Sequence, residues 1–231
     1  MRDCYVAEIN RLGEDTSARD QQHVDDRLAG YLIILYIKAA FPDDVLELFW
    51  DTAPVRARQH AMWFLGVQLE LPLDKFPDDL RARALSYWDR RLAATKASSP
   101  PDYFREKVGT IGPYFFRKDI DDEWLMDQVL SMSKAGFAPS EPYSVIDRLS
   151  KLSPDLPDRV AEVLAALVKN PRFDRWVYMT QSAAVRAILE NGLASGSPVT
   201  ASVVTETINY FSAMGDSSYL DLLTYRQMNK A

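Results

Sequence analysis

The chain has 231 residues, of which 47% are hydrophobic and 26% are charged. That length and apolar content are enough to bury a sizeable core, and they exclude a generally disordered protein. The 27 Lys and Arg residues are outnumbered by 33 Asp and Glu residues, which gives a net charge of −6. This acidic balance argues against a dedicated nucleic-acid-binding protein, because such proteins usually carry a strong net positive charge.

Compartment and membrane association are constrained by a few features of the sequence. Cys4 is the only cysteine, so the chain cannot form an intrachain disulfide. Its cysteine content therefore does not indicate an oxidising compartment. The first residues are polar and lack the apolar stretch of a secretory signal. The longest apolar run, over 28–37, is about half the length that crosses a bilayer. We therefore expect a cytoplasmic protein without membrane association.

The N-terminal half of the sequence predicts helices over about 25–41, 43–51, 54–71 and 77–97. The run over 28–37 is apolar all round, which predicts a central helix covered on several sides. A buried strand is the competing interpretation, since periodicity alone does not separate the two. Asp78 and Asp79 fall in the first turn of the helix over 77–97, where carboxylates complement the helix dipole.

The C-terminal half predicts helices over 121–135, 143–152, 158–170, 180–194 and 197–215. The clearest is 158–170, which begins after Pro157 and ends at Asn170-Pro171. Its apolar residues recur at helical spacing and form one continuous stripe, made of Val160, Val163, Leu164, Leu167 and Val168.

The last of these helices has a competing interpretation as a strand. Ser197-Pro198 is typical of an N-cap followed by the first helical residue. The β-branched residues over 199–207 favour a strand. Val204, Ile208 and Phe211 follow helical spacing, however, and strict alternation fails, so we predict a helix.

Together these segments predict an all-α protein of roughly ten to twelve helices joined by short connections. Short links between long helices favour antiparallel neighbours, as in an irregular HEAT-like helical repeat of stacked helix pairs. The Ser-Ser-Pro-Pro stretch at 98–101 is a candidate boundary. It would separate an N-terminal helical half, 1–97, from a C-terminal helical-repeat half, 102–231, unless the two form one continuous domain.

Several segments resemble the C-terminal helical-repeat region of large bacterial multidomain proteins, some of which are linked to phage defence. The segments that carry the resemblance are 64–66, 87–92, 121–125, 184–196, 208–209 and 219–223. The resemblance implies a region that recognises a partner or mediates assembly. There is no P-loop and no nucleotide-binding glycine fingerprint, so it implies no effector activity for this chain.

The most suggestive polar cluster is rich in arginine. Residues 53–96 hold eight basic and five acidic residues, a local charge of +3. On the helix predicted there, a basic surface with an aromatic residue suits an acidic peptide or a nucleic-acid backbone. The alternative is a solvated face whose arginines pair with Asp78, Asp79 and Asp89. The candidate partner-binding residues are Arg81, Arg83, Trp88, Arg90 and Arg91.

The five tryptophans lie at positions 50, 63, 88, 124 and 176, each among apolar residues. Core filling between helices explains most of them. One or two would serve as exposed anchors of an interface, because Trp and Arg are the usual hot-spot residues.

No pattern in the sequence predicts catalysis or a cofactor. His23 and His60, even with Cys4, match no metal-ligand spacing. No nucleophile elbow accompanies the serines. We therefore expect no cofactor, no metal and no catalytic residue, and we predict a non-catalytic scaffold for protein–protein interaction. A nucleic-acid-associated helical domain that uses the arginine-rich face, and an enzyme with a cryptic site, remain the alternatives.

Overall fold

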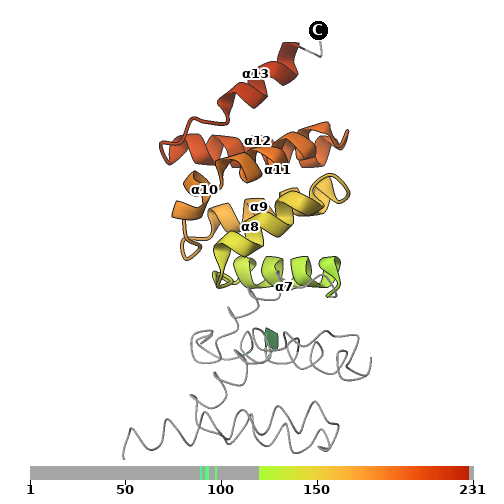
Figure 1. Ribbon diagram of the computed structural model, residues 1–231, viewed down its shortest axis with the longest axis vertical. Coiled ribbons are helices and arrows are strands. Elements are labelled where there is room, and N and C mark those ends of the chain that lie inside the picture. Colours follow the sequence, from blue (N-terminus) through green and yellow to red (C-terminus); the bar gives the residue numbers. More distant parts are fainter. Residues whose placement is uncertain (1–88, 90–91, 94–96, 98–119, 229–231) are drawn as a thin grey trace, which may run out of the picture. The chain divides into compact units, whose positions relative to one another are not determined.

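In a computed structural model of the chain, residues 120–228 form seven α-helices and no strand (Figure 1). The structure describes residues 89, 92, 93, 97 and 120–228, with side chains to residue 224. The helices are α7 (Asp122–Lys134), α8 (Pro142–Leu152), α9 (Pro157–Lys169), α10 (Trp176–Thr180), α11 (Ser182–Ala194), α12 (Pro198–Ala213) and α13 (Leu220–Met228). The predicted all-α class is confirmed for these residues.

The chain divides into two compact units, Met1–Thr110 and Ile111–Ala231. All seven helices belong to the second unit. Residues 89, 92, 93 and 97 are helical, as the helix predicted over 77–97 requires. The other helices predicted before residue 120, and the boundary predicted at 98–101, lie outside the described residues.

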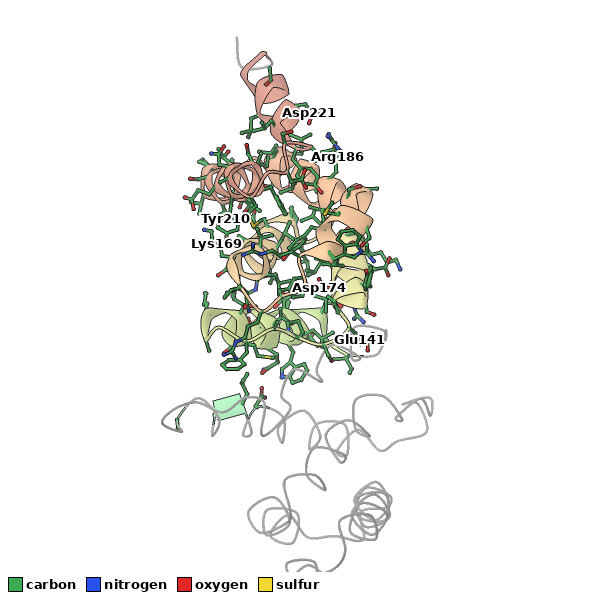
Figure 2. The ribbon with its side chains drawn as sticks, turned by 90° about the vertical axis from the view of Figure 1, so that its left-hand side faces the viewer. Glu141, Lys169, Asp174, Arg186, Tyr210 and Asp221 are labelled. Carbon is green, nitrogen blue, oxygen red and sulfur yellow. The ribbon has the colours of Figure 1, made fainter. Side chains whose placement is uncertain are left out.

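The helices of the second unit pack in two layers. One layer holds α7, α9 and α12, with α9 between the other two, and the other layer holds α8, α10 and α11. Figure 2 shows α9 and α12 on one side and α8 and α11 on the other. Short connections reverse the chain between α8 and α9 and between α11 and α12 (Figure 1). Each layer therefore covers the apolar face of the other.

The centre of this packing is α9, which contacts α7, α8, α11 and α12. All five residues of the predicted stripe are buried on it. The buried face is wider than predicted, since Ala161 and Ala165 are buried as well. Neighbours on several sides explain the difference, because a single amphipathic stripe serves only one neighbouring surface.

Local contacts mark the ends of α7 and the start of α12. The backbone N–H of Trp124 donates to Asp121 Oδ1 (2.7 Å), so Asp121 caps α7, and Gly136 follows its end with φ +81°. The backbone N–H of Thr200 donates to Ser197 Oγ (3.2 Å) at the start of α12. The Ser197 contact confirms the predicted start of α12, whereas α7 begins one residue later than predicted, at Asp122, because Asp121 is its N-cap.

The strand interpretation of residues 199–207 is not realised, because α12 is helical throughout that range. Two of its β-branched residues satisfy their hydroxyls inside the helix. Thr205 Oγ1 donates to the carbonyl of Ala201 (2.7 Å), and Thr207 Oγ1 donates to that of Val203 (2.8 Å). Burial of Val204, Ile208 and other residues against α9 outweighs the strand preference.

A glycine inside α11 allows two helices to approach closely. A Cβ atom added at Gly192 would lie 2.7 Å from Val204 Cγ2 and 3.4 Å from Ala161 Cβ. The first distance is shorter than van der Waals contact, so a larger residue would force either the Val204 side chain or α12 to shift. The close approach explains a glycine that costs about 1 kcal/mol of helix propensity.

Leu164 lies on the buried face of α9, so Leu164→Ala should lower the free energy of unfolding by about 2–5 kcal/mol. Glu162→Ala on the same helix should cost less than about 1 kcal/mol, because this side chain is partly exposed and its ion pairs lie at the surface. Urea denaturation of both variants measures the difference. Equal losses would contradict the assignment of the buried face.

Candidate protein-binding surface

The residues that the sequence singles out as a partner-binding face lie outside the described residues. Arg81, Arg83, Trp88, Arg90 and Arg91 all belong to that part of the chain, and so do Cys4 and both histidines. The arginine-rich face therefore stays a prediction. A candidate surface in the second unit has to be built from other residues.

Two kinds of site are not found among residues 120–228. No three His, Cys, Asp or Glu side chains described there gather as they would around a metal ion. None of the helices in this part of the chain has the length and apolar character of a membrane span. The exposed side chains of these helices form the surface of the unit.

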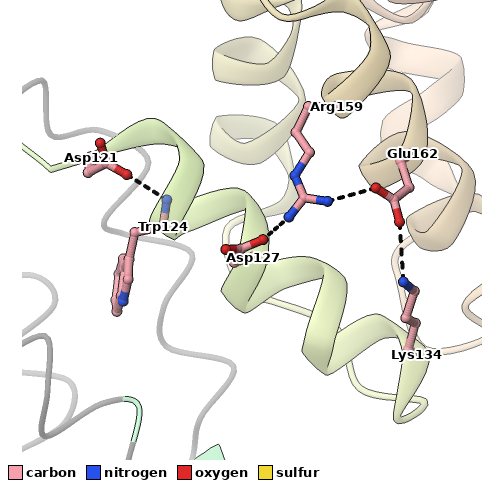
Figure 3. A network of polar contacts seen from close by, with 6 residues as sticks. All are labelled: Asp121, Trp124, Asp127, Lys134, Arg159 and Glu162. Carbon is pink, nitrogen blue, oxygen red and sulfur yellow. Dashed lines mark hydrogen bonds and ion pairs between the residues drawn. The ribbon is translucent and has the colours of Figure 1, made fainter.

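Much of that surface carries charges that neutralise one another. Arg159 of α9 pairs with Asp127 of α7 and with Glu162, and Lys134 of α7 donates to Glu162 Oε1 at 3.2 Å (Figure 3). Burial opposes the charged form of Glu162, but the hydrogen bonds from Lys134 and Arg159 outweigh it, and its pKa is lowered. Charges engaged in this way are less available to a partner.

Arg186 similarly ties α11 to the first turn of α13 and to the segment before it. Its guanidinium donates to both carboxylate oxygens of Asp221 (3.0 and 2.9 Å) and to the carbonyl of Ser218 (2.7 Å). Figure 2 shows the two side chains beside each other. The hydrogen bonds from Arg186 lower the pKa of Asp221, so the pair remains ionised near neutral pH.

The outward side of α10 differs from these self-paired surfaces. Trp176 and Met179 are 60% and 62% exposed, although both are large and apolar. They stand three residues apart, and Arg175 and Met179 four apart, so the three share one side of the helix. Val177 and Tyr178, in contrast, are buried. This short helix therefore presents apolar side chains to solvent.

A further aromatic residue belongs to the neighbouring helix α8. Tyr143 is 43% exposed. Gln181, directly after α10, donates from Nε2 to the carbonyl of Tyr143 at 3.1 Å, which brings the first turn of α8 beside the end of α10. We call Tyr143, Arg175, Trp176 and Met179 the α10 surface.

Asn170, at the end of α9, fixes the loop that leads into α10. Its side chain is buried, with Nδ2 donating to the carbonyl of Phe137 (2.6 Å) and Oδ1 accepting from the backbone N–H of Arg172 (3.0 Å). The Arg172 guanidinium lies over the Phe137 ring, 4.4 Å from its centroid. The backbone N–H of Trp176 then donates to Asp174 Oδ1 (2.9 Å). Side-chain contacts thus define the start of α10.

A row of four aromatic rings holds the inward side of α10. The ring centroids of Phe173 and Tyr178 are 5.6 Å apart, those of Tyr178 and Phe211 5.3 Å, and those of Phe211 and Tyr219 5.0 Å. The Tyr219 hydroxyl also donates to the carbonyl of Tyr178 (3.5 Å). Burial raises the pKa of Tyr178, and that of Tyr219 to about 12, so both rings are neutral. The row connects α10 to α12 and to the residue before α13.

Arg175 has neither an ion pair nor a ring contact with any side chain that the structure describes. Arg172 is engaged by the Phe137 ring, as described above. Each of the remaining lysines and arginines described in residues 120–224 pairs with a carboxylate, namely Lys134, Arg148, Lys151, Arg159, Lys169 and Arg186. The α10 surface therefore combines exposed apolar side chains with an unpaired positive charge.

The sequence indicates this surface only in part. Trp176 is one of the five tryptophans of which one or two were expected as exposed anchors, and its exposure agrees with that expectation. The helix predicted over 180–194 begins at Ser182, and α10 was not predicted. A helix of five residues is too short to show a periodic pattern.

Comparison of the chain with protein-family models, with curated proteins and with solved structures gives no match. The resemblance to helical-repeat regions of bacterial multidomain proteins therefore stays a prediction.

Because Asn170 satisfies two backbone groups, Asn170→Ala should lower the free energy of unfolding by about 1–3 kcal/mol. Asn209→Ala is the matched control, since Asn209 is exposed on α12 and should change stability by less than about 0.5 kcal/mol. Urea denaturation compares the two variants. If Asn170→Ala were as stable as the control, the loop before α10 would not depend on this side chain.

Proposed function

We propose that this chain is a non-catalytic helical scaffold that binds a partner protein through the α10 surface. Its helix pairs would stack as an irregular HEAT-like repeat, which presents side chains on an extended surface without disturbing the core. With the resemblance described above, the proposal extends to a cytoplasmic partner in a bacterial defence-type complex.

The observation that carries the proposal is the exposure of Trp176 and Met179 on a helix whose opposite side is firmly packed. Trp, Tyr, Met and Arg are the residues enriched at protein interfaces, and Trp, Tyr and Arg dominate their hot spots. Residues of all four types are exposed at α10 or in the adjoining first turn of α8. Exposed apolar side chains that lie together are a feature of binding sites, whereas single ones are ordinary.

The packing around α10 supports the proposal energetically. Association carries a cost for ordering the side chains and loops of an interface. The backbone of α10 is already held by the Asn170 contacts and by the buried Tyr178 ring. A partner would therefore bind a surface whose backbone needs little further ordering.

Affinity purification of the tagged full-length chain from its own cells tests this function. The double substitution Trp176→Ser with Met179→Ser should deplete at least one co-purified protein about tenfold or more, as expected for loss of hot-spot contacts. Quantitative mass spectrometry measures the depletion, and thermal melts show that the variant is folded.

The matched control is Val199→Ser, because Val199 is 74% exposed on α12 and lies outside the α10 surface. This variant should retain the partner. A folded double variant that retained every co-purified protein would remove the α10 surface from consideration.

A further inference from the structure

We infer that the occupant of the α10 surface is a short amphipathic helix of the partner that carries a carboxylate within one turn of its apolar anchors. The inference rests on the proposed function and specifies the chemistry of the partner. Its support comes from the size of the surface, the secondary structure around it and its unpaired charge.

The apolar area is too small for a stable dimer of folded chains on its own. The surface area of a large side chain is at most about 250 Å². With the exposed fractions of Tyr143, Trp176 and Met179, the solvent-exposed area of the three side chains together is about 400 Å². Standard interfaces bury about 800 Å² on each partner. The neighbouring charged side chains of α8, Asp147 and Lys151, already pair with each other at 2.6 Å. An area of this size suits a short peptide segment better than a second copy of the chain.

The surroundings favour a helix as the form of that segment. An extended peptide usually binds by adding a strand to the edge of a sheet, and residues 120–228 contain no strand. An amphipathic helix, in contrast, uses apolar residues three and four positions apart. Trp176 and Met179, three apart on one side of α10, offer such a helix two exposed apolar side chains to pack against.

The positive charge of Arg175 favours an acidic residue in the bound peptide segment. Arg175 is exposed, directly precedes Trp176 and forms no ion pair among the described side chains. The adjacent carboxylate of Asp174 accepts a hydrogen bond from the Trp176 backbone N–H and forms no ion pair with Arg175. A carboxylate next to the apolar anchors of the peptide would supply the missing ion pair for Arg175.

The experiment is selection of a phage library of random 16-residue peptides on the immobilised full-length chain. Phage that also bind the folded Trp176→Ser, Met179→Ser variant are removed. The inference expects peptides with apolar residues at positions i and i+3 or i+4 and an Asp or Glu within one turn of them. Failure to enrich any peptide, or enrichment of proline-rich peptides, would overturn it.

Charge exchange then tests the role of Arg175 with the selected peptides. Arg175→Glu should weaken binding about tenfold or more, and a peptide with Lys in place of its acidic residue should recover affinity for that variant. Lys134→Glu makes the same charge change on α7 and should alter Kd less than twofold. An Arg175→Glu variant that bound the original peptides unchanged would contradict the inference.

Two further outcomes separate this inference from the proposed function. Concentration-dependent self-association of the chain that Trp176→Ser abolishes, measured by analytical ultracentrifugation, would identify a second copy as the occupant and overturn the inference. If the purification finds a partner that depends on Trp176 while the peptide tests fail, only the inference is wrong. If the purification also finds none, the proposed function fails as well.

Discussion

Burial of α9 is the interaction on which the described part of the structure depends. Four helices of the unit pack against it, and the small residues Ala161 and Gly192 let α11 and α12 approach it closely. Because α9 is covered on several sides, its end is fixed in space. Asn170 stands at that end and ties the next loop to the carbonyl of Phe137. The position of α10 is thus a consequence of how α9 is packed.

The same packing explains how the protein maintains exposed apolar side chains on a short helix. Isolated helices of five residues are unstable in water, since nucleation costs more than so few hydrogen bonds return. The burial of Val177 and Tyr178 and the ring contact with Phe211 compensate for that cost. Folding therefore does not depend on the exposed side chains of α10. Their identity can be determined by what they bind.

The sequence predicts most of the helices in this unit but little of the candidate surface. Long segments with caps and a repeated apolar pattern, such as α9 and α12, are predicted almost to their ends. Gly192 gives no such signal, because the need for a glycine arises from Val204, a residue on another helix. The exposure of Trp176 is equally hidden, since nearby apolar residues such as Phe173, Val177 and Tyr178 are typical of a core tryptophan. The arginines at 81–91 were the more visible candidates, and they stay a prediction because they lie outside the described residues.

Amide hydrogen exchange across α10 in the full-length chain tests the central claim most directly, namely that α10 is a firmly held helix with an exposed outer side. The backbone N–H of Tyr178 donates to the carbonyl of Arg175 and that of Gln181 to the carbonyl of Val177. We expect both amides to exchange many times more slowly than an unstructured peptide, at rates close to that of Val185 at the start of α11. Exchange at the rate of an unstructured peptide would show that α10 is not held in place, and it would contradict the account of this surface as a preformed binding site.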